Sequence, residues 1–187
     1  MEIQSPAGGG RLQEPCGARE RVRVLYGEQV LDHLSLPMRG FLARQGMVFI
    51  ATADSRGECD CSFWTGSPEF AGALDNETLA YAEYKGTGVS NSLRNISENP
   101  HIGMLFVDPF ESAAVFHIRG RARIVVNGAI VNRPDLPERV RRDNAGEGGC
   151  RPERWVMVDV EEAHLRHSRR MPLREKPDND LRGKESS

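Results

Sequence analysis

The stretch from Phe116 to Val126 constrains the fold more than any other part of this sequence. Apolar or small residues alternate there with His117, Arg119, Arg121 and Arg123. A period of two is that of a β-strand with one buried face and one face of different character. We therefore expect a sheet with one side packed on a core and the other side basic.

Five more segments have the β-rich, apolar composition or the turn signals of strands: 47–52, 58–65, 78–83, 102–107 and 155–160. The run Asp54-Ser55-Arg56-Gly57 between the first two is typical of a hairpin turn. Helical spacing occurs only in short pieces, at 22–34, 38–44 and 89–98, with a further short helix within 136–142. Six strands, short helices and no βαβ alternation predict a mainly β fold, a small six-stranded antiparallel barrel.

The chain of 187 residues is long enough for one domain with a sizeable core. We expect residues 1–20 to form a flexible N-terminal tail, 21–168 the folded domain and 169–187 a flexible C-terminal tail, because both ends lack periodic apolar content. Within the domain, 66–76 and most of 127–151 are predicted to be loops.

Charge and composition exclude several classes of protein. The net charge of −2 argues against a protein that coats nucleic acid, and no apolar run is long enough for a membrane span. The first residues lack the basic and apolar regions of a signal peptide, and four cysteines are too few for a disulfide scaffold. The sequence therefore predicts a cytoplasmic protein with reduced thiols.

A glycine-containing turn before the predicted helix 89–98 is the best candidate site. Gly86 and Gly88 allow close backbone approach, Lys85 adds a positive charge, and short polar side chains follow at Thr87, Ser90, Asn91 and Ser92. Free N–H groups at a helix start favour an anion such as a phosphate. The alternative is an ordinary strand-to-helix turn in which Ser90 caps the helix and nothing binds.

Other candidate sites carry weaker signals. The basic strand face is either an anion or subunit contact, with Glu161 and Glu162 as acidic counterparts, or simply a solvated face. Cys59 and Cys61 lack the further ligands that a zinc site needs, so no metal is expected. His164 and His167 look like isolated surface residues. Because no nucleophile, base or metal set is evident, catalysis would need an organic cofactor.

The order of these segments resembles the pyridoxamine 5'-phosphate oxidase-like flavoproteins, which have the FMN-binding split β-barrel fold. The resemblance covers about Leu36 to Ser168. Its specific part is a Ser-Leu-x-Asn helix followed by Asn-Pro and an apolar strand, here within 92–103. The other matching stretches are 49–57, 60–62, 74–81, 120–123 and 155–163.

The resemblance implies a homodimer with two FMN sites at the subunit interface and a small-molecule substrate. The phosphate would be held by Lys85, Thr87, Asn91, Ser92 and Asn95, while the strand around Ser62, Phe63 and Trp64 would lie along the flavin ring. Close relatives tend to carry arginine at the position of Trp64, so this indole either contacts the cofactor or packs in the barrel. The family signature for the pyridoxamine phosphate substrate is not evident.

These observations predict an FMN-dependent oxidoreductase of unknown substrate. Two alternatives stay open on the same fold. One is a non-catalytic flavin- or haem-binding module, and the other is a deazaflavin-dependent reductase.

Overall fold

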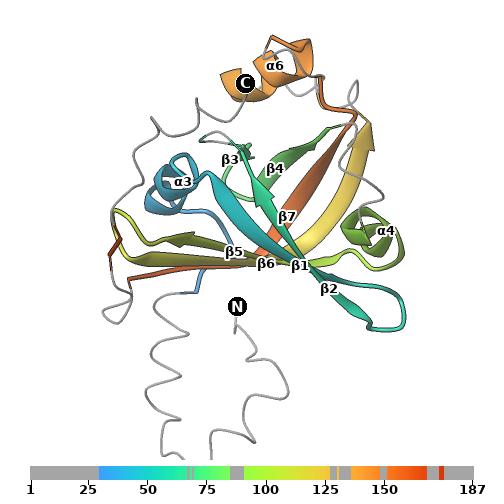
Figure 1. Cartoon of the computed structure of the whole chain (residues 1–187), viewed down its shortest axis with the longest axis horizontal. Helices are drawn as coiled ribbons and strands as arrows, with labels where there is room; N and C mark the ends of the chain where they lie inside the picture. The colour runs from blue at the N-terminus through green and yellow to red at the C-terminus, as the bar shows by residue number, and fades with distance from the viewer. Residues whose placement is uncertain are drawn as a thin grey trace, which may run out of the picture.

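The computed structural model describes residues 30–66, 68, 70–84, 91–126, 130, 136–147, 151–167 and 173–174. One antiparallel sheet of seven strands makes up most of them, in the order β2-β1-β5-β6-β7-β4-β3. Figure 1 shows the sheet curling around the core. The strands are β1 Met47–Ala53, β2 Cys59–Thr65, β3 Ala71–Ala73, β4 Thr78–Glu83, β5 His101–Asp108, β6 Ala114–Val126 and β7 Arg154–His167. The predicted mainly β split barrel is confirmed.

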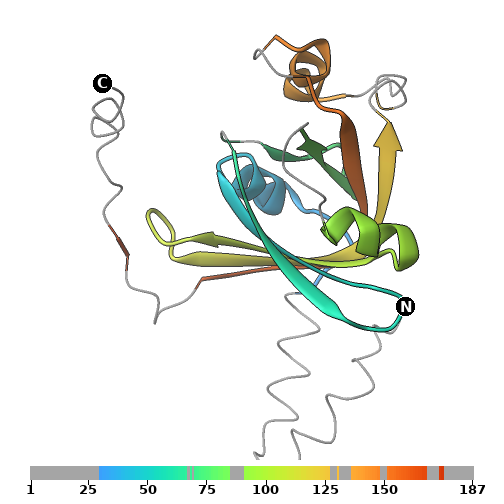
Figure 2. The same ribbon diagram turned by 45° about the vertical axis from the view of Figure 1, so that its right-hand side comes forward.

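Three short helices accompany the sheet in the described residues: α3 Leu36–Leu42, α4 Asn91–Glu98 and α6 Glu138–Ala145. Helix α3 buries Met38, Phe41 and Leu42, and the Phe41 ring meets Phe116 edge-on at 5.9 Å between ring centroids. Helix α4 packs mainly on β1 and also contacts β6 and β2, as Figure 2 shows. None of the described helices is long and apolar enough to cross a membrane.

The two faces of the sheet differ as the alternation predicts. Along β6, residues of one face are buried, while His117, Arg119, Arg121 and Arg123 point to the exposed face. The inward side chains form one large core. A second, smaller cluster packs beneath α6 on the other face of β4 and β7, and comprises Leu74, Ala80, Ala82, Ile130, Leu136, Val140, Trp155 and Met157.

A register shift between Arg119 and Gly120 interrupts the pairing of β6 with β7. Any side chain at Gly120 would overlap the backbone of Asp159, so this approach of the two strands requires glycine. The bulge lets the long β7 continue beyond the point where the sequence predicts its end at residue 160. The last strand therefore runs seven residues further, to His167.

Two other predictions are corrected. The segment 66–76 is not a continuous loop, because Ala71–Ala73 forms the edge strand β3 against β4. Residues 30–34, expected to end a helix, are not helical, and Leu31 exchanges backbone hydrogen bonds of 2.9 and 2.7 Å with Ala163. Residues 22–29 of that expected helix, and nearly all of both expected tails, lie outside the described residues.

Candidate functional site

The start of helix α4 meets strand β2 at two of the predicted site residues. Ser92 is completely buried, and its Oγ lies 2.7 Å from the Oγ of Ser62. Ser62 in turn donates a hydrogen bond of 2.9 Å to the carboxylate of Asp60. A serine hydroxyl carries one hydrogen, so Ser92 donates to Ser62. The result is a chain of hydroxyl groups, Ser92 to Ser62 to Asp60, that ends on a carboxylate.

Asn95 lies one turn further along α4 and is also buried. Its Nδ2 donates a hydrogen bond of 3.1 Å to the Thr52 Oγ1, but its Oδ1 has no partner. Asn91, the first residue of the helix, is exposed. A buried polar atom without a partner is unusual and often marks a place where water or a ligand binds.

The three β2 residues predicted to lie along a flavin ring occupy two faces of the strand. Ser62 and Trp64 point inward, and the Trp64 ring lies 6.2 Å from that of Tyr81, with its Nε1 unpartnered. Phe63 points outward, is 55% exposed and packs on Phe49 at 5.0 Å between ring centroids. In this structure Trp64 thus packs in the barrel, the second of the two positions considered for its indole.

Lys85 and Thr87, the two remaining predicted phosphate contacts, lie outside the described residues, as does Ser90. The site residues that the structure does describe show which groups of a flavin could be bound here. The described part offers the hydroxyl groups of Ser62 and Ser92, and beside them the carboxylate of Asp60, with which no described residue forms an ion pair. This set fits uncharged polar groups of a flavin, and it opposes a phosphate dianion.

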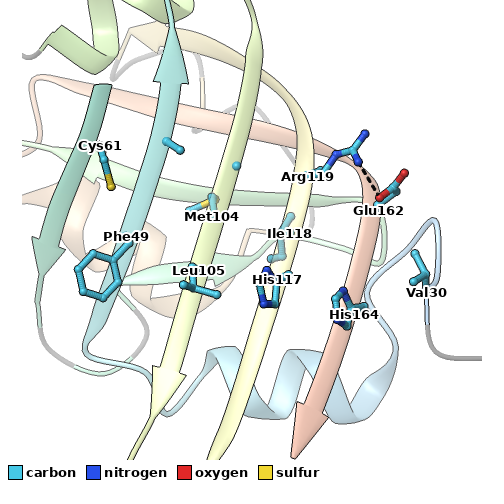
Figure 3. Close-up of a pocket in the computed structure, with 12 residues that line it drawn as sticks. Val30, Phe49, Cys61, Met104, Leu105, His117, Ile118, Arg119, Glu162 and His164 are labelled. Carbon is cyan, nitrogen blue, oxygen red and sulfur yellow. Dashed lines mark ion pairs between the residues drawn. The ribbon is translucent and has the colours of Figure 1, made fainter. Parts of the chain in front are cut away.

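The opposite face of the sheet holds a hollow of about 490 Å³. Figure 3 shows that β1, β2, β5, β6 and β7 all contribute to it. Its lining is largely apolar, with Phe49 and Leu105 on one side. An ion pair between Arg119 and Glu162, with an N–O distance of 3.2 Å, lies at its edge.

Two histidines stack in this hollow. The rings of His117 and His164 lie 4.8 Å apart and are nearly parallel, at 4°. Burial lowers the pKa of both imidazoles, and the nearby charge of Arg166 lowers them further; the pKa of His164 falls to about 4. Both rings are therefore neutral near pH 7. The expectation that His164 is an isolated surface residue was wrong, because β7 extends far enough to pair it with His117.

The basic face of β6 finds acidic partners within its own chain. Arg119 pairs with Glu162, as the sequence suggested, and Arg123 pairs with Asp159. Arg121 lies beside His101, with a nitrogen–nitrogen distance of 3.4 Å. Because two of the three arginines are neutralised locally, the face carries mixed charge rather than a free positive patch.

Cys59 and Cys61 are free and exposed on one face of β2. Within the described ranges, no group of three or more His, Cys, Asp or Glu side chains is arranged to hold a metal ion. The described cysteines thus offer thiols but no metal centre.

Sequence reasoning missed the roles of two acids. Asp60 was noted only as part of a matching stretch, and Glu83 only as the end of a strand. Glu83 is buried, its Oε1 has no partner, and burial raises its pKa to about 7 although the charge of Arg154 opposes the rise. The signal for Asp60 was its spacing: it stands two residues before Ser62 on a strand and so shares its face.

Comparison with known proteins agrees with the fold. The family model described as pyridoxamine 5'-phosphate oxidase matches residues 37–166. No curated protein matches the chain. The solved HupZ from Group A Streptococcus is similar, with 21% identity and a TM-score of 0.55 over 72% of this chain and 94% of its own.

Two further solved structures show weaker likeness. A putative pyridoxamine 5'-phosphate oxidase from Lactobacillus delbrueckii is 15% identical, covering 72% of this chain and 98% of its own, with a TM-score of 0.49. HutZ, the haem storage protein of Vibrio cholerae, is 14% identical, covering 72% and 94%, with a TM-score of 0.46. The family match spans most of the folded residues and the curled sheet is the one expected for it, so the chain belongs to the pyridoxamine 5'-phosphate oxidase family.

Proposed function

We propose that this protein is a flavin-binding oxidoreductase that uses FMN and acts on a small molecule. The observation that carries the proposal is the meeting of Ser62 on β2 with Ser92 at the start of α4, at 2.7 Å. The family resemblance of the sequence implies that both residues contact the cofactor. Family membership makes a flavin the expected cofactor.

Different residues of the site would bind different groups of the cofactor. Helix α4 contributes Ser92, which is bonded to Ser62, and Asn95, whose buried Oδ1 has no partner and can accept a hydrogen bond. Lys85 and Thr87, just before the helix in sequence, supply the cation and hydroxyl that a phosphate needs. When bound, a flavin supplies hydride transfer, which no described side chain can perform.

We further propose that the protein is a homodimer with its cofactor at the subunit interface. The outer face of the sheet exposes the neighbouring, mutually tilted rings of Phe49 and Phe63 beside the apolar hollow. Exposed apolar surface of this kind usually marks an interaction site. A second copy suits it because a two-fold axis brings the same apolar patch of each copy together, and because Arg119 and Glu162 neutralise each other beside that patch.

The absorption spectrum of the purified protein, before and after addition of FMN, tests the proposal. We expect an oxidised-flavin spectrum, quenched flavin fluorescence and bleaching with NADH or NADPH. Ser62→Ala should weaken FMN binding about tenfold, which corresponds to the loss of one hydrogen-bonding group. The matched control is Ser97→Ala, since that exposed serine of α4 bonds only to the backbone of Arg94.

A protein that takes up no FMN under these conditions contradicts the proposal. Uptake without reduction by any pyridine nucleotide would point to a non-catalytic flavin-binding module. Uptake of a deazaflavin in place of FMN would identify the alternative reductase on the same fold.

Haem binding is a second candidate, favoured by one observation. His117 and His164 are neutral imidazoles in an apolar hollow, and neutral imidazole is a common ligand of haem iron. Titration with haemin distinguishes the two candidates. A Soret band that disappears in His164→Ala would favour haem, whereas an unchanged weak spectrum in both proteins would exclude this site.

A further inference from the structure

We propose that a groove across the outer face of the sheet is a separate small-molecule site, and that it takes a planar, uncharged ring bearing an amide group. The groove consists of the hollow of about 490 Å³ and a neighbouring hollow of about 360 Å³. Neither Ser62 nor Ser92 of the proposed cofactor site lines these hollows. Binding in the groove therefore does not require a flavin.

The shape of the groove follows from a row of small residues across the sheet. Ala51 of β1 pairs with Gly103 of β5, which pairs in turn with Arg119 of β6. Both hollows are lined by these three residues, so they adjoin over one floor. A Cβ at Gly103 would meet only the Cβ of Ala51 within 4 Å, at 3.8 Å. The floor is therefore open above Gly103 and admits a planar group lying on the sheet.

The row beside this floor is bulky and carries no charge near pH 7. It runs across β1, β5, β6 and β7 through Phe49, Leu105, His117 and His164. Figure 3 shows these side chains along one side of the hollow. Both imidazoles are neutral because burial and the charge of Arg166 lower their pKa. This wall suits an apolar or aromatic ring, as in most small-molecule sites.

The ion pair between Arg119 and Glu162 supplies the polar groups at the edge of the groove. It joins one guanidinium nitrogen to one carboxylate oxygen at 3.2 Å. Arg119 is 55% exposed and has further N–H donors, and Glu162 has a second oxygen that accepts. A donor and an acceptor thus stand side by side. An amide group presents the complementary acceptor and donor.

The same ion pair disfavours charged ligands. A carboxylate that binds Arg119 would lie beside the like charge of Glu162, and an ammonium group that binds Glu162 would lie beside Arg119. Either ion must separate the pair or bear the repulsion, whereas an uncharged amide leaves the pair intact. The groove therefore selects by rejecting ions as well as by binding the amide.

The site is compatible with the homodimer proposed above. Phe63 lines neither hollow, and its ring packs on Phe49 toward the β2 edge of the groove. A second copy packed on these two rings would cover the groove and exclude water from the ligand bound in it.

Three probes of one shape test the selection by charge: naphthalene carrying a carboxamide, a carboxylate or an aminomethyl group at the same ring position. Their dissociation constants are measured from the change in naphthalene fluorescence. The place of binding is measured from the protection of Cys61, an exposed thiol that lines the hollow, against alkylation by iodoacetamide. We expect wild type to bind the amide about tenfold more tightly than either ion, and the amide to protect Cys61.

Glu162→Gln removes one charge of the pair and keeps the size of the side chain. The carboxylate probe should then bind about tenfold more tightly, because Arg119 loses its anionic neighbour, while the affinity for the amide changes by less than about threefold. Asp159→Asn is the matched control. It removes the same charge from the ion pair with Arg123, which also joins β6 to β7 but lines neither hollow. It should bind all three probes as wild type does.

Gly103→Leu tests the floor of the groove. The new side chain would stand in the groove, since a Cβ at Gly103 meets nothing closer than the ordinary contact with Ala51. It should weaken binding of the amide by more than about tenfold and leave the protein folded, which circular dichroism checks.

Equal affinity of wild type for the three probes, or a preference for either ion, overturns the inference. Binding of the amide without protection of Cys61 also overturns it, as does an affinity for the carboxylate probe that Glu162→Gln leaves unchanged. No binding of the amide to wild type overturns it as well, and haemin that then protects Cys61 would assign the hollow to haem. None of these measurements contains FMN, so the proposed flavin function is tested separately by its own spectrum.

Discussion

At the scale of single residues, this site is governed by what each polar group is bonded to. The sequence pointed to Ser92 from its place near a helix start and to Ser62 through the family resemblance, and the structure brings the two together. It could not show that Ser62 donates its hydrogen to Asp60, because strand spacing gives a shared face but not a hydrogen-bond direction. The carboxylate of Asp60 therefore adds a hydrogen-bond acceptor beside the two serines.

Glu83 gives a prediction about stability. Its pKa is raised to about 7 in the folded protein by burial, against an ordinary value of 4.5. Between these two values the folded chain keeps a proton that the unfolded chain releases, so the free energy of unfolding falls as pH rises. Glu83→Gln removes this dependence. In urea denaturation, the variant should gain about 2 to 3 kcal/mol relative to wild type on going from pH 5 to pH 8.

The control for this measurement is Glu153→Gln, which changes an exposed carboxyl group next to Arg154. It should follow the wild-type profile across the same range. Parallel pH profiles of Glu83→Gln and wild type would show that Glu83 is not buried in its neutral form.

At the scale of elements, the sequence predicted the strands whose pattern is strong and missed those set by pairing. The alternation in β6 and the turn at Asp54–Gly57 are local signals, and both agree with the structure. Strand β3 consists of alanine and glycine, which carry no strand signal, and exists because it pairs with β4. The C-terminal half of β7 begins with Glu161 and Glu162 and pairs with β6 beyond a bulge. The sequence does not show a register that changes at a bulge, so His164 could not be placed beside His117 from sequence.

Strand β2 offers a test of which face Trp64 occupies. Trp64 packs on the core beside Tyr81, whereas Thr65, the next residue, is exposed on the other face. Trp64→Arg should lower the free energy of unfolding by about 3 to 5 kcal/mol, because it removes aromatic packing and buries a charge. Thr65→Arg should change it by less than about 0.5 kcal/mol. A stable Trp64→Arg protein with tighter FMN binding would instead place the indole at the cofactor.

The bulge between β6 and β7 makes a second prediction at this scale. A side chain at Gly120 would overlap the Asp159 backbone, while one at Gly103 on the neighbouring β5 would meet the Ala51 Cβ at an ordinary 3.8 Å. Gly120→Ala should therefore cost about 2 to 4 kcal/mol of stability, and Gly103→Ala less than about 1 kcal/mol. Equal thermal midpoints for the two variants would show that the bulge tolerates a side chain.

At the scale of the whole molecule, the described residues leave part of the outer face of the curled sheet uncovered. The core fills the inside of the curl, and α6 covers the smaller cluster. The outer face keeps Phe49 and Phe63 exposed next to the hollow that holds the stacked histidines. Covering this face would exclude water from any cofactor bound along β2, which lies at the edge of the sheet.

Phe63→Arg tests whether a second copy covers this face. Phe63 is 55% exposed, so the change leaves the single chain folded, but each interface would lose an aromatic contact and gain a charge. At about 2 kcal/mol per copy, the dimer dissociation constant should rise about a thousandfold. Sedimentation equilibrium should then give the chain mass of 20.8 kDa for the variant and twice that mass for wild type.

The control is Val126→Arg, which places the same charge on another exposed apolar residue, at the far end of β6 from the hollow. It should remain a dimer. If the cofactor lies between the subunits, its binding and the assembly of the dimer are linked. The FMN affinity of Phe63→Arg must then fall together with dimerisation, and it must rise again at high protein concentration. Wild type that sediments as a monomer would refute the dimer, and a monomeric Phe63→Arg with unchanged FMN affinity would place the flavin within a single chain.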